Sequence, residues 1–241
     1  MAKRQTSNLP IDISAHLAAE AEAISARIAA PSGDRIQLKG NSRIITPDGI
    51  EGPEIEVVII DFVSTNLFYP DAYDPDSPQQ PSCFAIGKEP STLTPSTNSD
   101  NQEAATCSAC PNNQFGSADN GKGKACKNTR LLAVADVNAG EDADIWVLAV
   151  SPSSLKTFDA YVKKLSSKHG TVPIAALTRI GLSQAVDYAS PTFTLERMLD
   201  TQEVETFFQR REEAMQRLLT EPDTSKPDVA PAPKKRATRR K

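Results

Sequence analysis

Apolar side chains recur at helical spacing in three segments of the chain. Residues 11–30 are rich in alanine, place isoleucine and leucine on one side and stop before Pro31, which predicts an N-terminal packing or oligomerisation helix. Residues 153–170 present one apolar face and end at Gly170. Residues 201–221 present another apolar face, which includes Phe207 and Phe208, behind Thr201 as the expected cap. We therefore expect a helix inside the fold and one at each end.

Strand patterns fill most of the chain between these helices. Two short pieces within residues 34–49 precede residues 54–69, in which the run from Val57 to Ile60 is apolar without interruption. Such a run is typical of a buried strand. Further strand patterns lie at residues 130–137, 143–152, 172–183 and 191–199. An acidic hairpin is expected between the first two of these, and Trp146 is expected in the core.

The clustering of these strands predicts the fold class. Because strands do not alternate with helices, the pattern favours an α+β, mainly β fold. We expect a small antiparallel barrel of the OB type, with a helix inserted between its later strands. The predicted regions are a helical segment (1–33), a barrel core (34–200) with an insertion at about 70–130, a C-terminal helix (201–222) and a disordered basic tail (223–241).

Composition and charge narrow the classes of protein. The chain has 241 residues, of which 39% are hydrophobic, and a net charge of −4. No apolar run is long enough for a membrane span and the basic start lacks an apolar stretch behind it, which predicts a cytoplasmic protein. The segment 226–241 carries seven Lys or Arg against one Asp, so the rest of the chain carries −10. A basic tail on an acidic body suggests a polyanionic partner.

Four cysteines lie in and beside a polar segment that cannot build a core from its own apolar residues. Residues 70–106 are rich in Pro, Ser, Asp and Asn, and they lead into a C-x-x-C pair. In a cytosolic protein such cysteines favour a metal over disulfides. Four thiolates complete the tetrahedral shell of a structural zinc ion, and the candidate ligands are Cys83, Cys107, Cys110 and Cys126. An iron–sulfur cluster, a redox pair and unliganded buried thiols remain alternatives.

The residues around the cysteines have the chemistry of a nucleic-acid surface. Residues 107–130 carry Lys122, Lys124, Lys127 and Arg130 against Asp119 alone. Lysines for phosphates together with aromatics for bases are the combination used to bind single strands. We add Lys88 to the candidate cations, and the candidate stacking residues are Phe68, Tyr69, Tyr73, Phe84 and Phe115. For Phe115, a place in a small core under the metal is the equal alternative.

Catalytic patterns are weak in this sequence. The two histidines, His16 and His169, lie far apart in the sequence, and His169 next to Gly170 is typical of a helix end. There is no nucleophile elbow, zinc-protease motif or dinucleotide fingerprint. A metal-dependent nuclease would use scattered carboxylates, of which the first candidates are Asp61, Asp71, Asp74 and Asp76. We expect a binding protein and no enzymatic activity.

The stretch CSACPNNQFGSADNGKGKACKNTRLLAV, with PSCFAIGK upstream, resembles a segment of tailed-bacteriophage proteins of replication and recombination. These are zinc-containing, single-stranded-DNA-binding proteins of OB type, and the resemblance covers roughly residues 81–135. It implies zinc on the four cysteines, lysines near the strand and the cytoplasm of an infected bacterium. It also implies replication or recombination proteins as partners. Assembly into a homo-oligomer is a further expectation. The ending KKRATRRK departs from the acidic tail typical of such proteins, which puts that family's mode of partner recruitment in doubt.

One other class of function stays open. An accessory or regulatory protein could use its zinc loop to bind a polymerase or another host protein. Affinity for a protein together with none for DNA would distinguish this class from a strand binder, whose affinity falls steeply with salt.

Overall fold

The computed structural model describes residues 34–40, 43–71 and 79–222. The predicted N-terminal helix at 11–30, Tyr73, Asp74, Asp76 and the basic tail lie outside these residues. Within the described ranges, no helix is both long and apolar enough to cross a membrane.

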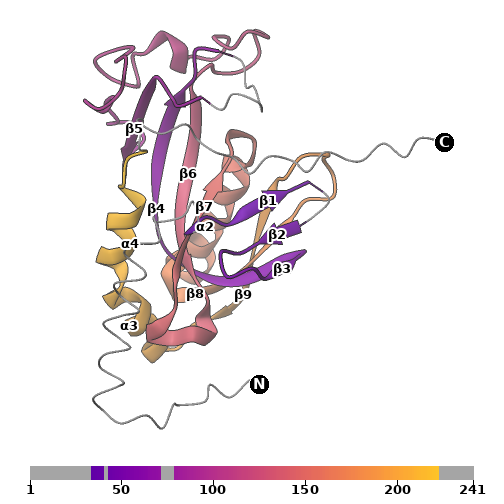
Figure 1. Cartoon of the computed structure of the whole chain (residues 1–241). Coiled ribbons are helices and arrows are strands. Elements are labelled where there is room, and N and C mark those ends of the chain that lie inside the picture. The colour runs from indigo at the N-terminus through magenta and orange to yellow at the C-terminus, as the bar shows by residue number, and fades with distance from the viewer. Residues whose placement is uncertain (1–33, 41–42, 72–78, 223–241) are drawn as a thin grey trace, which may run out of the picture.

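The described residues form an α+β fold that is mainly β, with antiparallel strands in two sheets (Figure 1). The small sheet has the order β1 (Gln37–Lys39), β2 (Arg43–Ile45), β3 (Glu51–Gly52). In the large sheet the order is β7–β6–β4–β8–β9, and β5 pairs with β4 as well. Its strands are β4 (Glu54–Phe68), β5 (Cys83–Gly87), β6 (Lys127–Ala135), β7 (Ile145–Val150), β8 (Ala176–Leu182) and β9 (Pro191–Met198).

The large sheet is open in the part of the chain that the structure describes. Strand β4 is 15 residues long and pairs with β6 along one edge. Its other edge pairs with β8 over residues 54–58 and with β5 over residues 64–68. Since β7 and β9 end the strand order, no closed barrel forms among the described residues. The predicted fold class is confirmed at the level of antiparallel, mainly β structure with helices, whereas a closed barrel is not found.

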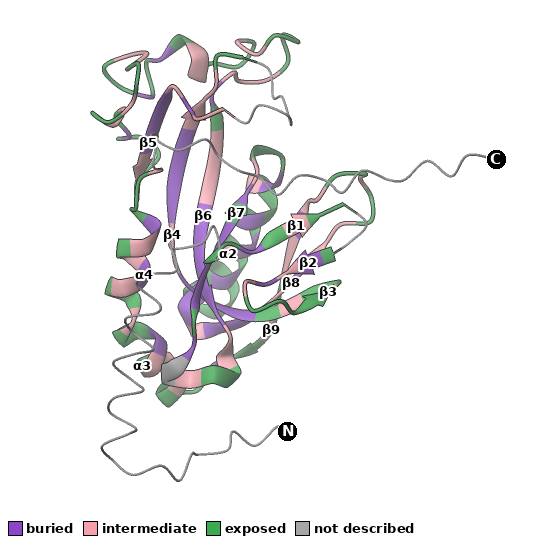
Figure 2. Ribbon diagram, in the orientation of Figure 1, coloured by how far each residue is buried: buried purple, intermediate pink, exposed green. Residues whose placement is uncertain are grey.

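The continuous apolar run of β4 follows from burial on both faces of the sheet (Figure 2). Val57 and Ile59 belong to one core cluster, which also contains Phe158 of the helix α2 (Leu155–His169). Val58 and Ile60 belong to a second cluster on the other face, with Phe207 from the C-terminal helical region. A strand that is covered on both faces loses the alternation of apolar and polar residues, so the sequence signal for this strand was correct.

The predicted internal helix is confirmed as α2. It begins after Ser154, whose side chain makes no capping hydrogen bond, and a short 3-10 turn η4 (Pro152–Ser154) precedes it. Gly170 ends the helix in the left-handed conformation with φ of 62°, which glycine adopts without a Cβ penalty. His169 lies in the last turn, where the helix dipole favours a cation.

The predicted C-terminal helix is two helices, α3 (Thr201–Gln209) and α4 (Arg211–Leu218). Its cap is Asp200 and not Thr201, because Asp200 and Glu203 form a capping box. The break at Arg210 lets α3 and α4 both pack on the same face of the sheet, while the Arg210 guanidinium donates to the Ala143 carbonyl. Phe208, expected on the apolar side, is 56% exposed.

Two other connections refine the prediction. The acidic segment between β6 and β7 is not a simple hairpin loop but a pair of 3-10 turns, η3 (Val137–Asp142), capped by Asp136. Another 3-10 turn, η5 (Pro173–Ala175), leads into β8. Trp146 on β7 is buried, as expected.

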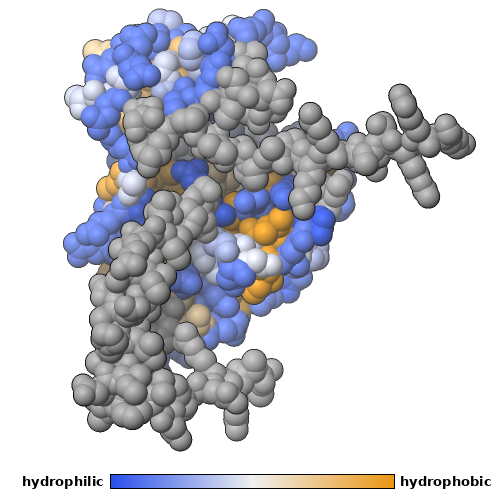
Figure 3. Space-filling view, viewed as in Figure 1, coloured by the Kyte–Doolittle hydropathy of each residue, from blue (hydrophilic) through white to orange (hydrophobic). Residues whose placement is uncertain are grey.

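Strands β4 and β6 extend past the two core clusters and carry a separate lobe of loops. We call residues 79–126 the cysteine lobe; its regular elements are β5 and the 3-10 turn η2 (Pro111–Asn113). In the space-filling view the surface of this lobe is largely hydrophilic (Figure 3). Glu221, just after α4, fixes one side of the lobe by accepting hydrogen bonds from Ser96 (2.7 Å) and Asn98 (2.6 Å).

Candidate nucleic-acid interface built on four cysteines

Backbone pairing brings the four cysteines together from three separate segments. Cys83 begins β5 and lies opposite Phe68 of β4. The amide of Cys107 donates to the carbonyl of Leu93 at 3.0 Å, and the amide of Cys126 donates to the carbonyl of Asn112 at 2.8 Å. Cys110 stands directly before η2, whose Pro111 ends the C-x-x-C segment. The cysteines are therefore positioned by the strand register and by loop hydrogen bonds.

All four cysteines are buried and line one small cavity, together with Asn66 and Phe68. The cavity has a volume of about 10 Å³, close to the space that one water molecule fills. Among the described residues, however, no three or more His, Cys, Asp or Glu side chains are arranged as a ready ligand set for a metal ion. The four cysteines thus line one cavity, and their role as zinc ligands stays a prediction.

Two of the thiols, those of Cys107 and Cys126, are electrostatically unfavourable as isolated thiolates. Burial, together with the charges of the three other cysteines, raises the pKa of Cys126 to about 12. Burial also raises the pKa of Cys107, and a hydrogen bond with the Asn66 side chain partly offsets this rise. A bound cation would reverse this balance, because opposite charge favours the thiolate form. The raised pKa values of Cys107 and Cys126 are thus what a bound cation would be expected to lower.

An asparagine network joins this cluster to a surface lysine. The side chain of Asn113 donates to the Cys107 carbonyl at 2.7 Å and accepts from Lys124 Nζ at 3.2 Å. Asn128 donates to the Asn113 side-chain oxygen at 2.9 Å and to that of Asn66 at 2.6 Å. Asn66 in turn bonds the Cys107 thiol. Sequence reasoning missed these asparagines, and only the register that places Asn66 opposite Asn128 reveals them.

Replacing Asn113 by Ala should weaken zinc binding by about tenfold or more. The substitution removes a donor that fixes the C-x-x-C segment, and groups that orient metal ligands typically affect affinity by about 10- to 100-fold. Zinc affinity would be measured by competition with a chromophoric chelator. The control is Asn101→Ala, which removes only an exposed side-chain bond to Glu103. Equal zinc affinities for the two variants would contradict this role of Asn113.

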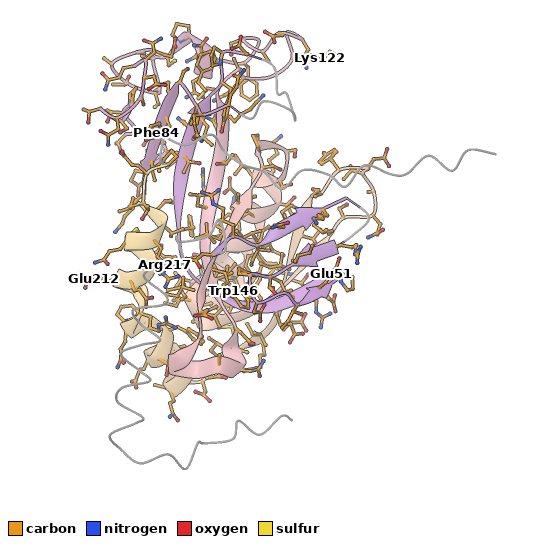
Figure 4. The ribbon with its side chains drawn as sticks, in the orientation of Figure 1. Glu51, Phe84, Lys122, Trp146, Glu212 and Arg217 are labelled. Atoms are coloured by element: carbon orange, nitrogen blue, oxygen red, sulfur yellow. The ribbon has the colours of Figure 1, made fainter. Side chains whose placement is uncertain are left out.

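Phe115 and Lys124 form the most distinctive feature of the lobe surface. The Phe115 ring is 84% exposed, and Lys124 Nζ lies 5.2 Å from its centroid, a cation–π distance. Lys122 is also exposed, at the outer end of the lobe (Figure 4), and its amide donates to the Asn120 side chain. The alternative place for Phe115, in a small core under the cysteines, is therefore wrong.

The other candidate stacking residues are less suited to that role. Phe84 is 1% exposed, so its ring cannot stack on a base, and this expectation is corrected: Phe84 lies in the run of buried residues that begins β5. Phe68 is half-buried and lines the cysteine cavity, which gives it a packing role. Tyr69 is half-buried and makes other interactions, and Tyr73 lies outside the described residues.

The candidate cations divide into two groups. Lys127 is exposed and Arg130 is half-buried, both on β6 where it leaves the lobe. Lys122 and Lys124 lie in the loop that leads into β6. These four cations are therefore close together in the sequence, within residues 122–130. Lys88 is exposed but follows the end of β5 at Gly87, opposite Ser64 and away from the cysteines.

The carboxylates considered for a nuclease do not come together in the part described. Asp61 is paired with Arg211 at 2.7 Å and accepts a hydrogen bond from the Phe62 amide. Asp71 is exposed, and Asp74 and Asp76 lie outside the described residues. Of the candidate nuclease residues that the structure describes, Asp61 is therefore held in an ion pair and Asp71 faces solvent.

The site stands on its own geometry. No protein-family model, curated protein or solved structure matches the chain in comparisons with known proteins. An inference about function therefore depends on the cysteine cavity, the asparagine network and the exposed pair of Phe115 and Lys124.

Proposed function

We propose that the protein binds single-stranded DNA without enzymatic activity, in phage-type replication or recombination, through residues 107–130, which comprise the end of the cysteine lobe and the start of β6. The observation that carries this proposal is the exposed Phe115 ring beneath Lys124. These residues lie on a stretch of net charge +3, although the whole chain carries −4. An exposed aromatic on a basic loop is the combination that binds a strand through base stacking and phosphate contacts.

Each group has a distinct part in this proposal. A base would stack on the Phe115 face that Lys124 leaves open. Lys122, Lys124 and Lys127 would contact phosphates, and Arg130 would extend that path along β6. Since stacking uses the π-face that every base has, sequence preference should be weak. The open sheet from which the lobe projects would serve as an OB-like scaffold for the strand.

Zinc would be structural in this proposal. The described lobe has a very small apolar cluster, made of Ala85, Leu93 and Cys107. A metal held by four sulfurs supplies the folding free energy that such a cluster lacks, and it leaves no open position for water. An iron–sulfur cluster is the alternative that the same four thiols allow.

The decisive experiment is a fluorescence-anisotropy titration of the pure protein with a labelled thymidine oligonucleotide and a matching duplex. We expect tighter binding to the single strand than to the duplex. Each phosphate contact on a single strand contributes about −0.7 to the slope of log K against log salt, so four cations give a slope of about −3. Absence of binding at low salt, or cleavage of the oligonucleotide, would contradict the proposal.

A second candidate is an accessory protein that grips a polymerase or other host protein with the same lobe. The exposed Phe115 also favours this possibility, because aromatic residues are common anchors in protein interfaces. The second candidate would be supported if the protein with Phe115 in place captures a protein partner and has no affinity for DNA. Homo-oligomer formation is compatible with both.

A further inference from the structure

A groove lies between α2 and the edge strand β9, outside the cysteine lobe. Its volume is about 240 Å³, and its lining includes Tyr161, Lys164 and His169 from α2 and Phe193 and Leu195 from β9. None of the residues that line it is acidic. The groove thus joins an apolar floor to a rim that carries a lysine and a histidine.

The helix above this groove is basic, although the whole chain has a net charge of −4. It carries four lysines against Asp159, and these lysines are all exposed. Lys168 and His169 stand in the last turn, where the helix dipole alone accounts for cations. Lys164 lies one turn earlier and lines the groove, so the dipole does not explain its place. The charge of this surface is complementary to a polyanion.

The floor is an ordered aromatic surface. Phe193 is half-buried, and its ring packs against Phe158 with a centroid distance of 5.2 Å and against Tyr161 at 6.0 Å. The Tyr161 hydroxyl is hydrogen-bonded to Thr178, which holds that ring in place. The groove therefore combines an aromatic ring that is held by its packing with a lysine, Lys164, in the same lining.

We propose that the α2–β9 groove is a second contact site for single-stranded nucleic acid. This proposal rests on the proposed function of the cysteine lobe. The phosphate backbone contacts Lys164 and His169, and a base packs against the exposed part of Phe193. A strand held at both places would be guided over the body of the protein as well as over the lobe.

The test compares Lys164→Ala with Lys163→Ala in the full-length protein, by oligonucleotide anisotropy over a range of salt. Both variants remove one exposed charge from α2, but only Lys164 lines the groove. We expect Lys164→Ala to reduce the steepness of the salt slope by about 0.7, and Lys163→Ala to leave it close to that of the wild type. An oligonucleotide carrying 5-iodouracil should also photo-cross-link to Phe193.

The outcomes separate this inference from the proposed function. If the wild type binds the oligonucleotide but the two lysine variants behave alike, the groove assignment is wrong and the lobe assignment stands. A wild type with no affinity for the oligonucleotide would overturn both. A third outcome would overturn the nucleic-acid assignment and assign the groove to an acidic protein. In that outcome polyglutamate displaces the oligonucleotide from the wild type but not from Lys164→Ala, and no cross-link to Phe193 forms.

Discussion

Replacing Cys110 by Ser is expected to release zinc and unfold the cysteine lobe, while the core on the two faces of the large sheet stays folded. The reason is the separation of the two parts. The core clusters on the faces of the large sheet contain no cysteine, and the lobe has only the small cluster around Leu93. Folding free energy from a structural zinc site is on the order of 10 kcal/mol, far more than that cluster can replace.

Hydrogen exchange with mass spectrometry, together with metal analysis, would measure this effect. In Cys110→Ser we expect loss of protection in residues 79–126 and retained protection in β6, β7 and β8. The control is Ser108→Ala, an exposed position in the same C-x-x-C segment, which should keep its metal and its protection. Cooperative loss of protection across the sheet would show that the lobe and core are one unit. If the wild type contains iron and has a visible absorption band, the bound group is an iron–sulfur cluster and not zinc.

The elements of the core were predictable because local signals agree with the tertiary structure. The apolar run of β4, the amphipathic pattern of α2 and its final Gly170 each have one structural interpretation. The break between α3 and α4 was not predictable, because residues 201–221 contain neither glycine nor proline. The break follows from tertiary packing, because it allows Phe207 of α3 and Leu218 of α4 to enter the same core cluster.

The open sheet and the interior of the lobe depend on strand register, which the sequence pattern does not contain. Periodicity could not show that one edge of β4 is shared between β8 and β5. The same register places both Cys83 and its buried neighbour Phe84 along the cysteine cavity. It also brings Asn66 and Asn128 opposite each other, 62 positions apart in the chain. The four cysteines that the sequence offers as metal ligands do line one cavity, while their binding of a metal stays a prediction.

Replacing Phe115 by Ala is expected to weaken single-strand binding strongly without changing the fold. Base–aromatic stacking contributes about 1–3 kcal/mol per base, which corresponds to a loss of about 5- to 150-fold in affinity. The salt slope should stay close to that of the wild type, because no charge is removed. Lys124→Ala should instead reduce the steepness of the slope by about 0.7. Anisotropy titrations of both variants over a range of salt would separate stacking from phosphate contact.

Phe208→Ala is the matched control for the stacking role of Phe115. Phe208 is also an exposed phenylalanine, and Arg211 lies over its ring at 5.9 Å, but it stands on α3 outside the cysteine lobe. If exposed aromatics bind strands only because they are exposed, both alanine variants will lose affinity equally. If the position on the basic lobe matters, only Phe115→Ala will lose it, and Phe115→Trp will restore binding because it returns a stacking surface. Wild-type affinity in Phe115→Ala, with zinc retained, would remove the observation on which the strand-binding proposal depends.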